Sequence, residues 1–230
     1  MIGDRWLPLE SNPDVMNRYI KALGVDTDKW KFVDVYGLDD ELLEMVPHPA
    51  CAILLLFPIN SNYEKNRIEE EEKVRSEGQF VSSCLYFMPQ TISNACGTLG
   101  VIHAIANNME VLQCEGLLKA FIEQSKDLSL SEKALMLQND SGITSCHDSS
   151  ALEGQTLAPS REESVNLHFI ALVQKEGYLY ELDGRRPFPI NHGRSNEETF
   201  LKDAAIVCKK FMEFDKESLQ FNVVALAKVN

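Results

Sequence analysis

The apolar residues of this chain recur at helical spacing in some segments and follow strand patterns in others. Val15, Tyr19 and Leu23 fall on one face of a helix, after Asn12 and Pro13, which favour a helix start. The same criteria, with charged, glycine and proline boundaries, predict further helices at residues 40–45, 69–77, 95–106, 117–125, 131–137 and 197–213.

Strand patterns occur between these helices. Residues 50–57 form a continuous apolar run that is typical of a buried strand and is far shorter than the roughly 20 residues of a membrane span. Further strands are predicted at residues 32–36, 165–173, 178–183 and 219–227. Because the order lacks a regular βαβ rhythm, we expect an α/β protein of the α+β type. Its central, largely antiparallel sheet is flanked by helices, in one domain over residues 1–230.

Residues 139–164 have neither a helical nor a strand period. Loops without structure that exceed about 12–15 residues are uncommon in compact domains and usually serve as functional lids or linkers. We therefore expect one long loop across this segment.

Composition narrows the function classes. A hydrophobic content of 44% and a charged content of 25% suit an ordinary globular core. The net charge of −13 argues against nucleic acid or an anionic membrane as a partner. It suits a basic partner, but on charge alone an acidic surface that serves only solubility is the favoured explanation. No secretory signal or membrane span is recognisable, so we expect a soluble, cytoplasmic protein. The six cysteines form no C-x-x-C pair, which argues against disulfides and a metal site.

Cys96 is the candidate nucleophile. It falls in the first turn of the predicted helix 95–106, with Ser93 or Asn94 as the cap, where unpaired N–H groups and the helix dipole favour a thiolate. Gly97 leaves room for a substrate backbone. The alternative is a small, inert core cysteine.

A base for this thiol is available in the predicted C-terminal hairpin. If residues 174–177 form a four-residue loop, His168 lies opposite Asp183, and a carboxylate-oriented imidazole is what a nucleophile requires. A two-residue turn places His168 opposite Arg185 instead, and a lone strand histidine is often structural. Gln90, six residues before Cys96, is either an oxyanion donor or an ordinary surface residue.

These segments resemble the ubiquitin carboxyl-terminal hydrolase family. The resemblance is carried by residues 90–98, 166–172 and 180–185, which contain the cysteine, histidine and aspartate motifs in family order. Residues 5–10, 32–37 and 187–193 are also similar. The match spans essentially the whole chain and is closest to short members without a C-terminal extension.

The resemblance implies a papain-like fold with a knotted backbone and a cofactor-free, metal-free thiol mechanism. Cys96 would be the nucleophile, His168 the general base and acid, Asp183 its orienting partner, and Gln90 the oxyanion donor. The segment 139–164 would arch over the active site and admit only small or unfolded adducts.

The resemblance also implies ubiquitin as the partner. We take the ubiquitin-like protein NEDD8 as a second candidate substrate and expect a monomer. The expected ubiquitin-facing residues are Pro8, Leu9, Glu10, Asp14 and Asp34. Two alternatives remain at this stage: a non-catalytic ubiquitin-binding module with the same fold, and a Cys-His-Asp enzyme acting on another acyl substrate.

Overall fold

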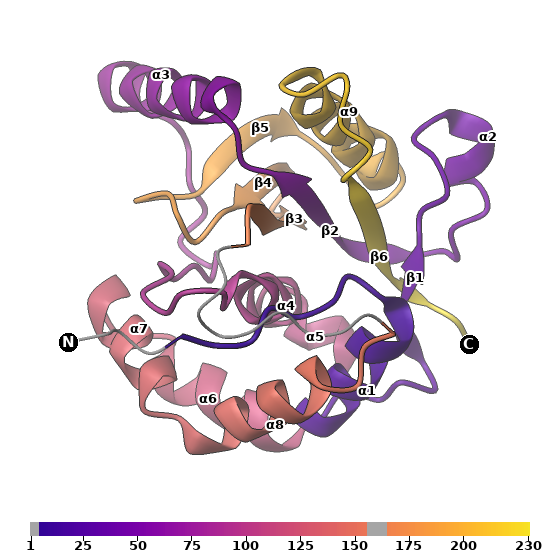
Figure 1. The fold of residues 1–230 in the computed structure, drawn as a ribbon, viewed down its shortest axis with the longest axis vertical. Helices are drawn as coiled ribbons and strands as arrows, with labels where there is room; N and C mark the ends of the chain where they lie inside the picture. The colour runs from indigo at the N-terminus through magenta and orange to yellow at the C-terminus, as the bar shows by residue number, and fades with distance from the viewer. Residues whose placement is uncertain (1–4, 156–164) are drawn as a thin grey trace.

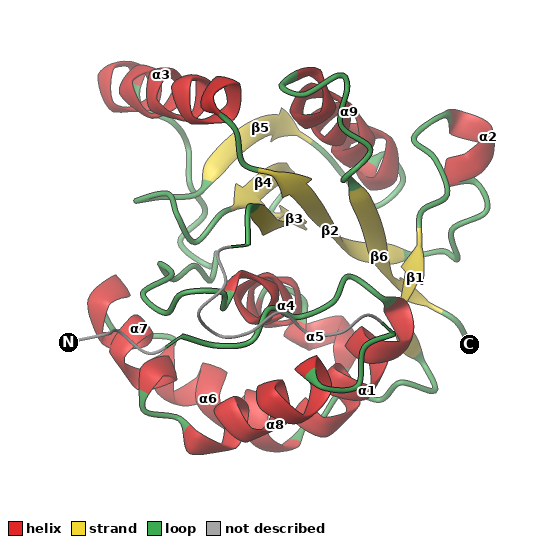
Figure 2. Ribbon diagram, in the orientation of Figure 1, coloured by secondary structure: helices red, strands yellow, loops and turns green. Residues whose placement is uncertain are grey.

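A six-stranded antiparallel sheet runs through the middle of the molecule, with helices on both faces (Figures 1 and 2). The structure is a computed structural model that describes residues 5–155 and 165–230. The strands are β1 (Trp30–Asp34), β2 (Ala50–Pro58), β3 (Leu167–Lys175), β4 (Tyr178–Leu182), β5 (Ile190–Arg194) and β6 (Asn222–Lys228). Their order across the sheet is β1-β6-β2-β3-β4-β5, so the fold class expected from the sequence is confirmed.

The helices form two layers (Figure 1). One layer has α4 directly against the sheet and α1, α6 and α8 outside it, while α3 and α9 cover the other face. The helices of the described residues are α1 (Pro13–Leu23), α2 (Asp40–Leu43), α3 (Ser61–Glu77), α4 (Cys96–Ala106), α5 (Met109–Leu112), α6 (Gly116–Ser125), α7 (Leu130–Gln138), α8 (Ser141–Ala151) and α9 (Phe200–Glu213). None of these helices is long and apolar enough to cross a membrane.

The sheet is buried on both faces, which explains the continuous apolar run in β2. Leu54 faces the core shared with α1, α4 and α6, whereas the next residue, Leu55, faces the core shared with α9. Because successive side chains of a strand point to opposite faces, a strand between two helix layers needs apolar residues at every position.

The helix predicted from Val15, Tyr19 and Leu23 is confirmed as α1. The Asn12 side chain accepts a hydrogen bond from the Asp14 N–H at 2.9 Å, so Asn12 is the N-cap. Other boundaries differ: α3 begins eight residues before the predicted helix 69–77, and α5 and β5 were not predicted.

The prediction of one long loop at residues 139–164 was wrong for its first half. Residues 141–151 form α8, capped by Asp140, whose carboxylate accepts from the Ile143 N–H at 2.8 Å. The buried residues of α8 are Ile143, His147, Ser150 and Ala151. Two of these four residues are polar, so a search for apolar periodicity misses the helix. Residues 156–164 lie outside the described residues.

Candidate active site

The cysteine of interest is the first residue of α4. Its N-cap is Ala95, and not Ser93 or Asn94 as predicted. Asn94 instead has a positive φ of 64° and donates its side-chain N–H to the Trp6 carbonyl at 3.1 Å. The Trp6 N–H in turn donates to the Ser93 carbonyl at 3.0 Å. The N-terminal segment is therefore fixed beside the residue that opens α4.

Gly97 serves a different purpose from the one predicted. A Cβ atom at this position would lie 2.9 Å from Leu9 Cβ and 3.4 Å from a ring carbon of Phe169. The space beside Gly97 is thus filled by the protein itself and is not left open for a substrate backbone. The glycine allows α4 to approach β3 and the N-terminal segment closely.

His168 and Asp183 do meet, but not in the expected hairpin register. Lys175 pairs with Tyr178 across a two-residue turn, so the alternative register is the correct one. The pair forms because β4 ends at Leu182 and the chain turns at Asp183. From this turn, Asp183 Oδ1 accepts a hydrogen bond from His168 Nε2 at 2.6 Å. The side chains are 3% and 0% exposed, so the contact is shielded from water.

The charges of this cluster favour a thiolate–imidazolium pair. Burial raises the pKa of the Cys96 thiol, but the hydrogen bond and charge of His168, together with backbone N–H groups, lower it below its ordinary value. Burial lowers the pKa of His168, whereas Asp183 and Cys96 raise it, and the net result is a pKa of about 10. Because Nε2 is bonded to Asp183, Nδ1 is the ring nitrogen available to the sulfur.

Cys96 differs in this respect from other cysteines of the chain. Burial raises the thiol pKa of Cys51, Cys114, Cys146 and Cys208. All six cysteines are free thiols. A thiol needs a lowered pKa to act as a nucleophile near neutral pH, so the electrostatics support Cys96 as the reactive one.

Gln90 lies against the turn that carries Asp183. Its backbone N–H donates to the Gly184 carbonyl at 2.7 Å, and a Cβ on Gly184 would come within 2.9 Å of Gln90 Cβ. The Gln90 amide donates one N–H to the Ile92 carbonyl at 3.0 Å. An amide nitrogen has two N–H groups, so a second donor remains for a developing oxyanion.

A cavity of about 180 Å³ opens at Cys96. Its walls are mostly apolar and include Pro8, Leu9 and Glu10, three of the residues expected to face ubiquitin. Asp14 lies exposed in the first turn of α1, and Asp34 ends β1; neither lines this cavity. The structure thus brings the N-terminal segment, but not these two aspartates, to the cysteine.

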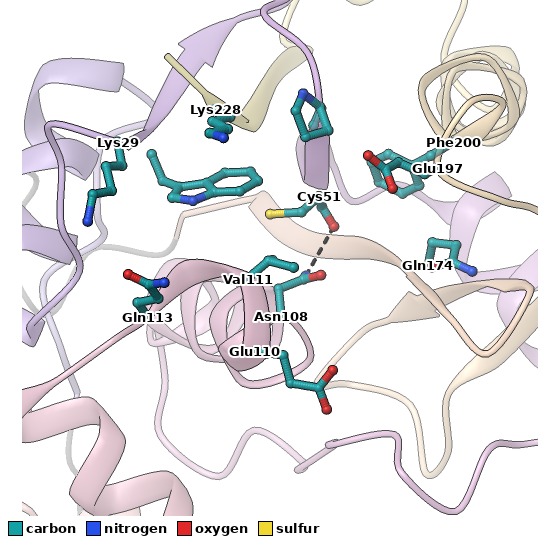
Figure 3. A pocket seen from close by; sticks show the side chains of 13 residues that line it. Lys29, Cys51, Asn108, Glu110, Val111, Gln113, Gln174, Glu197, Phe200 and Lys228 are labelled. Atoms are coloured by element: carbon teal, nitrogen blue, oxygen red, sulfur yellow. Dashed lines mark hydrogen bonds between the residues drawn. The ribbon is translucent and has the colours of Figure 1, made fainter. Parts of the chain in front are cut away.

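A second cavity, of about 500 Å³, has a different lining, which does not include Cys96 (Figure 3). Asn108 donates a hydrogen bond to the Cys51 carbonyl across it, and Lys29, Lys228 and Glu110 also line it. None of the four candidate catalytic residues lines this cavity. Within residues 5–155 and 165–230, no group of three His, Cys, Asp or Glu side chains is placed to hold a metal ion.

Two contributors to the site were missed in the sequence. Tyr63 donates its hydroxyl to Asp183 Oδ2 at 2.7 Å, and Arg186, 3% exposed, donates to Glu181 at 2.9 Å close behind the triad. The charge run 69–77 was read as a solvated face, yet its Glu70 pairs with Arg186 at 2.7 Å. The sequence held a signal only for the start of this helix: Asn60 precedes Tyr63 by three residues, which is the spacing between an N-cap and the backbone N–H that donates to it.

Residues 6–213 of the chain match the family described as ubiquitin carboxyl-terminal hydrolase, family 1. This chain belongs to that family. It is therefore a cysteine-type hydrolase, and the family resemblance seen in the sequence is confirmed.

Relatives of this hydrolase extend over almost its whole length. A probable ubiquitin carboxyl-terminal hydrolase of Dictyostelium discoideum is 47% identical over 97% of this chain and 88% of its own length. The ubiquitin carboxyl-terminal hydrolase of Drosophila melanogaster is 48% identical over 96% of each. Human isozyme L1 is 46% identical over 96% of this chain and 97% of its own. Among solved structures, the Trichinella spiralis UCH37 catalytic domain bound to ubiquitin vinyl methyl ester has the same fold, with a TM-score of 0.75, 22% identity and coverage of 97% and 96%.

Proposed function

We propose that this hydrolase cleaves adducts from the C-terminal glycine of ubiquitin through a thioester on Cys96. The observation that carries the proposal is the buried hydrogen bond from His168 to Asp183, together with the lowering of the Cys96 pKa by His168, at a cysteine that lines an apolar cavity. The imidazole is oriented by a buried carboxylate and the thiol has a lowered pKa, as nucleophilic catalysis requires.

The reaction follows from this geometry. The Cys96 thiolate attacks the carbonyl carbon of the last glycine, and the oxyanion accepts hydrogen bonds from the Cys96 N–H and the Gln90 amide. When the C–N bond breaks, the His168 imidazolium gives its proton to the leaving amine and a thioester remains. Water then attacks the thioester while His168 takes its proton. The C–S bond breaks, the C-terminal carboxylic acid of ubiquitin leaves and loses its proton to the solvent, and the Cys96 thiolate is restored beside the His168 imidazolium.

The shape of the cleft supports a glycine-ending substrate. Leu9 and Phe169 narrow the cavity beside Cys96 to about 180 Å³, which suits a chain end without side chains. The net charge of −13 favours an arginine-bearing tail. We propose Pro8, Leu9 and Glu10 as contacts of this tail and Asp14 and Asp34 as outer contacts of ubiquitin. NEDD8 is a second candidate on the same grounds.

We further propose that only small or unfolded adducts are accepted. Ala151 at the end of α8 and Val165 both line the cavity, so the segment between them begins and ends at the cleft. Residues 156–164, the middle of that segment, lie outside the described residues. A chain that passes over a cleft limits the size of the leaving group that fits beneath it.

The test is hydrolysis of a fluorogenic amide of the ubiquitin C-terminus. Cys96→Ala is expected to abolish turnover and to keep ubiquitin binding, because only the sulfur is removed. The matched control is Cys84→Ala, which removes an exposed cysteine and is expected to keep the parent rate. Turnover by Cys96→Ala at the parent rate would show that the nucleophile is misassigned.

A ubiquitin probe with a C-terminal electrophile separates the two remaining functions. A hydrolase becomes covalently labelled at Cys96, whereas a non-catalytic ubiquitin-binding module binds the probe without labelling. The same probe built on NEDD8 measures the second substrate. Equally efficient cleavage of short peptides without ubiquitin would instead indicate a general acyl hydrolase.

We also propose that the chain acts as a monomeric, single catalytic domain in the cytoplasm, of the short isozyme L-three type. The six free cysteines support a reducing compartment, because secreted proteins of this size usually pair theirs. Elution as a dimer in size-exclusion chromatography would contradict the monomer.

A further inference from the structure

The carboxylate of Asp183 is held from two sides. Oδ1 accepts from His168 Nε2 at 2.6 Å and from the Arg185 N–H at 2.8 Å, whereas Oδ2 accepts from the Tyr63 hydroxyl at 2.7 Å. Asp183 is fully buried and Tyr63 is 1% exposed. Without the Tyr63 hydroxyl, Oδ2 would therefore lose its hydrogen bond in a site that water does not reach.

The position of Tyr63 is set by the start of α3. The Asn60 side chain accepts from the Tyr63 N–H at 2.9 Å as the N-cap, and Asn60 Nδ2 donates to the Phe214 carbonyl at 3.2 Å after α9. The Tyr63 ring packs edge-on against Phe57, with centroids 4.8 Å apart, and near Phe211 at 6.0 Å. The hydroxyl has little freedom to move away from Asp183, because both the backbone and the ring are fixed.

The remainder of α3 is tied to the same turn. Arg185 pairs with Glu64 at 2.5 Å, and Arg186 pairs with Glu70 at 2.7 Å. The Arg186 N–H also donates to the Asp183 carbonyl at 3.0 Å, which closes the turn. Asp183, Arg185 and Arg186 of this turn thus all contact α3, and Tyr63 is the residue that reaches the carboxylate itself.

We propose that Tyr63 is a positioning residue of this active site: it fixes the Asp183 carboxylate, which in turn orients His168 toward Cys96. The contacts of α3 with the turn hold Tyr63 in place. The inference rests on the proposed thiol mechanism. Burial and the charges of Asp183 and Glu181 raise the pKa of Tyr63, so the hydroxyl keeps its proton and donates. Tyr63 acts on the reaction only through Asp183, because its hydroxyl contacts the side of the carboxylate that faces away from His168.

The first experiment compares two tyrosine-to-phenylalanine variants. Tyr63→Phe keeps the ring packing and removes the hydroxyl. Tyr86→Phe is the matched control, because its hydroxyl also makes a buried hydrogen bond, to Ser125 at 2.7 Å, in the helical layer away from the triad. A buried hydrogen bond to a charged group is worth a factor of about ten or more in an equilibrium. We expect kcat for the ubiquitin amide to fall about ten-fold in Tyr63→Phe with KM within about two-fold, and no change in kcat in Tyr86→Phe.

A second readout follows the triad directly. If Asp183 is misplaced, its attraction for His168 weakens, the pKa of His168 falls, and the Cys96 thiolate loses part of its partner charge. The midpoint of Cys96 alkylation by iodoacetamide is therefore expected to move to higher pH in Tyr63→Phe and to stay in place in Tyr86→Phe. Loss of stability alone does not shift this midpoint.

A double variant separates positioning through Asp183 from a general effect on the fold. In an Asp183→Asn background, removal of the Tyr63 hydroxyl is expected to change the alkylation rate less than two-fold, because the carboxylate is already gone. Parent-like kcat and alkylation in Tyr63→Phe, or equal losses in both backgrounds, overturn the proposal. Activity that survives Cys96→Ala overturns the thiol mechanism instead, so the two failures are distinguishable.

Discussion

Replacement of Arg186 tests how much a buried ion pair contributes to the stability of this protein. Its side chain is 2% exposed and pairs with Glu181, itself 1% exposed, at 2.9 Å, and with Glu70 at 2.7 Å. Arg186→Met keeps most of the apolar stem and removes the charge. Glu181 then loses its principal cation inside the protein, with only His192 at 2.9 Å remaining.

The expected loss of stability in Arg186→Met follows from the burial of the charges and not from the number of ion pairs. Removing one partner of a buried pair destabilises a protein by about 3–5 kcal/mol, because the other charge stays uncompensated. Against a typical free energy of unfolding of about 5–15 kcal/mol, this is a large fraction. At about 2–4 °C per kcal/mol for a chain of this size, the melting temperature is expected to fall by roughly 6–20 °C.

The assay is thermal and urea unfolding followed by circular dichroism, with Lys202→Met as the matched control. Lys202 pairs with Asp40 at 2.7 Å, the same distance as one of the Arg186 pairs, but the two side chains are 54% and 70% exposed. A surface pair contributes only about 0–1 kcal/mol. Equal losses of stability in the two variants would refute the reasoning, because ion-pair distance would then matter more than burial.

Two further predictions concern the catalytic site. Gly184→Ala is expected to lower kcat about ten- to hundred-fold, because the new Cβ would lie 2.5 Å from a Leu99 methyl and 3.1 Å from Gln90 N and must displace the oxyanion donor. The control is Gly142→Ala, whose Cβ meets only side chains, among them a Leu117 methyl at 2.9 Å. Equal kcat values in the two variants would contradict the prediction. The rate of Cys96 alkylation is expected to near its plateau at a pH below the ordinary thiol pKa of about 8.5, because the pKa of Cys96 is lowered. The rate of hydrolysis is expected to decline as the pH rises through the His168 pKa of about 10, where the proton for the leaving amine is lost. An alkylation midpoint at the ordinary thiol value would show that His168 does not stabilise the thiolate.

The parts of the fold with a strong apolar period were predictable from sequence. The helix from Val15 to Leu23 and the strand that begins at Ala50 have unambiguous spacing and boundaries, and both are found close to the predicted ends. The segment 141–151 was not, since its buried face contains His147 and Ser150, and periodicity methods count only apolar residues.

The candidate site, too, was predictable from sequence only in part. Position at a helix start made Cys96 a candidate, and the family motifs supplied His168 and Asp183 as its expected partners. The four-residue hairpin loop that would have placed His168 opposite Asp183 was wrong, and their contact arises from the turn after β4. The turn residues Glu176 and Gly177 both have positive φ, which favours a two-residue hairpin. Tyr63 was out of reach because its partner lies 120 residues further along the chain, and no local pattern encodes such a contact.

The place of β6 in the sheet has a consequence for synthesis. β6 lies between β1 and β2, so these two early strands have no direct pairing with each other and depend on the last strand of the chain. While the ribosome is still making α9, both strands present unpaired edges, which is the state most prone to wrong association. The nascent polypeptide therefore gains the pairing between β6 and its two neighbours only when residues 222–228 have left the exit tunnel.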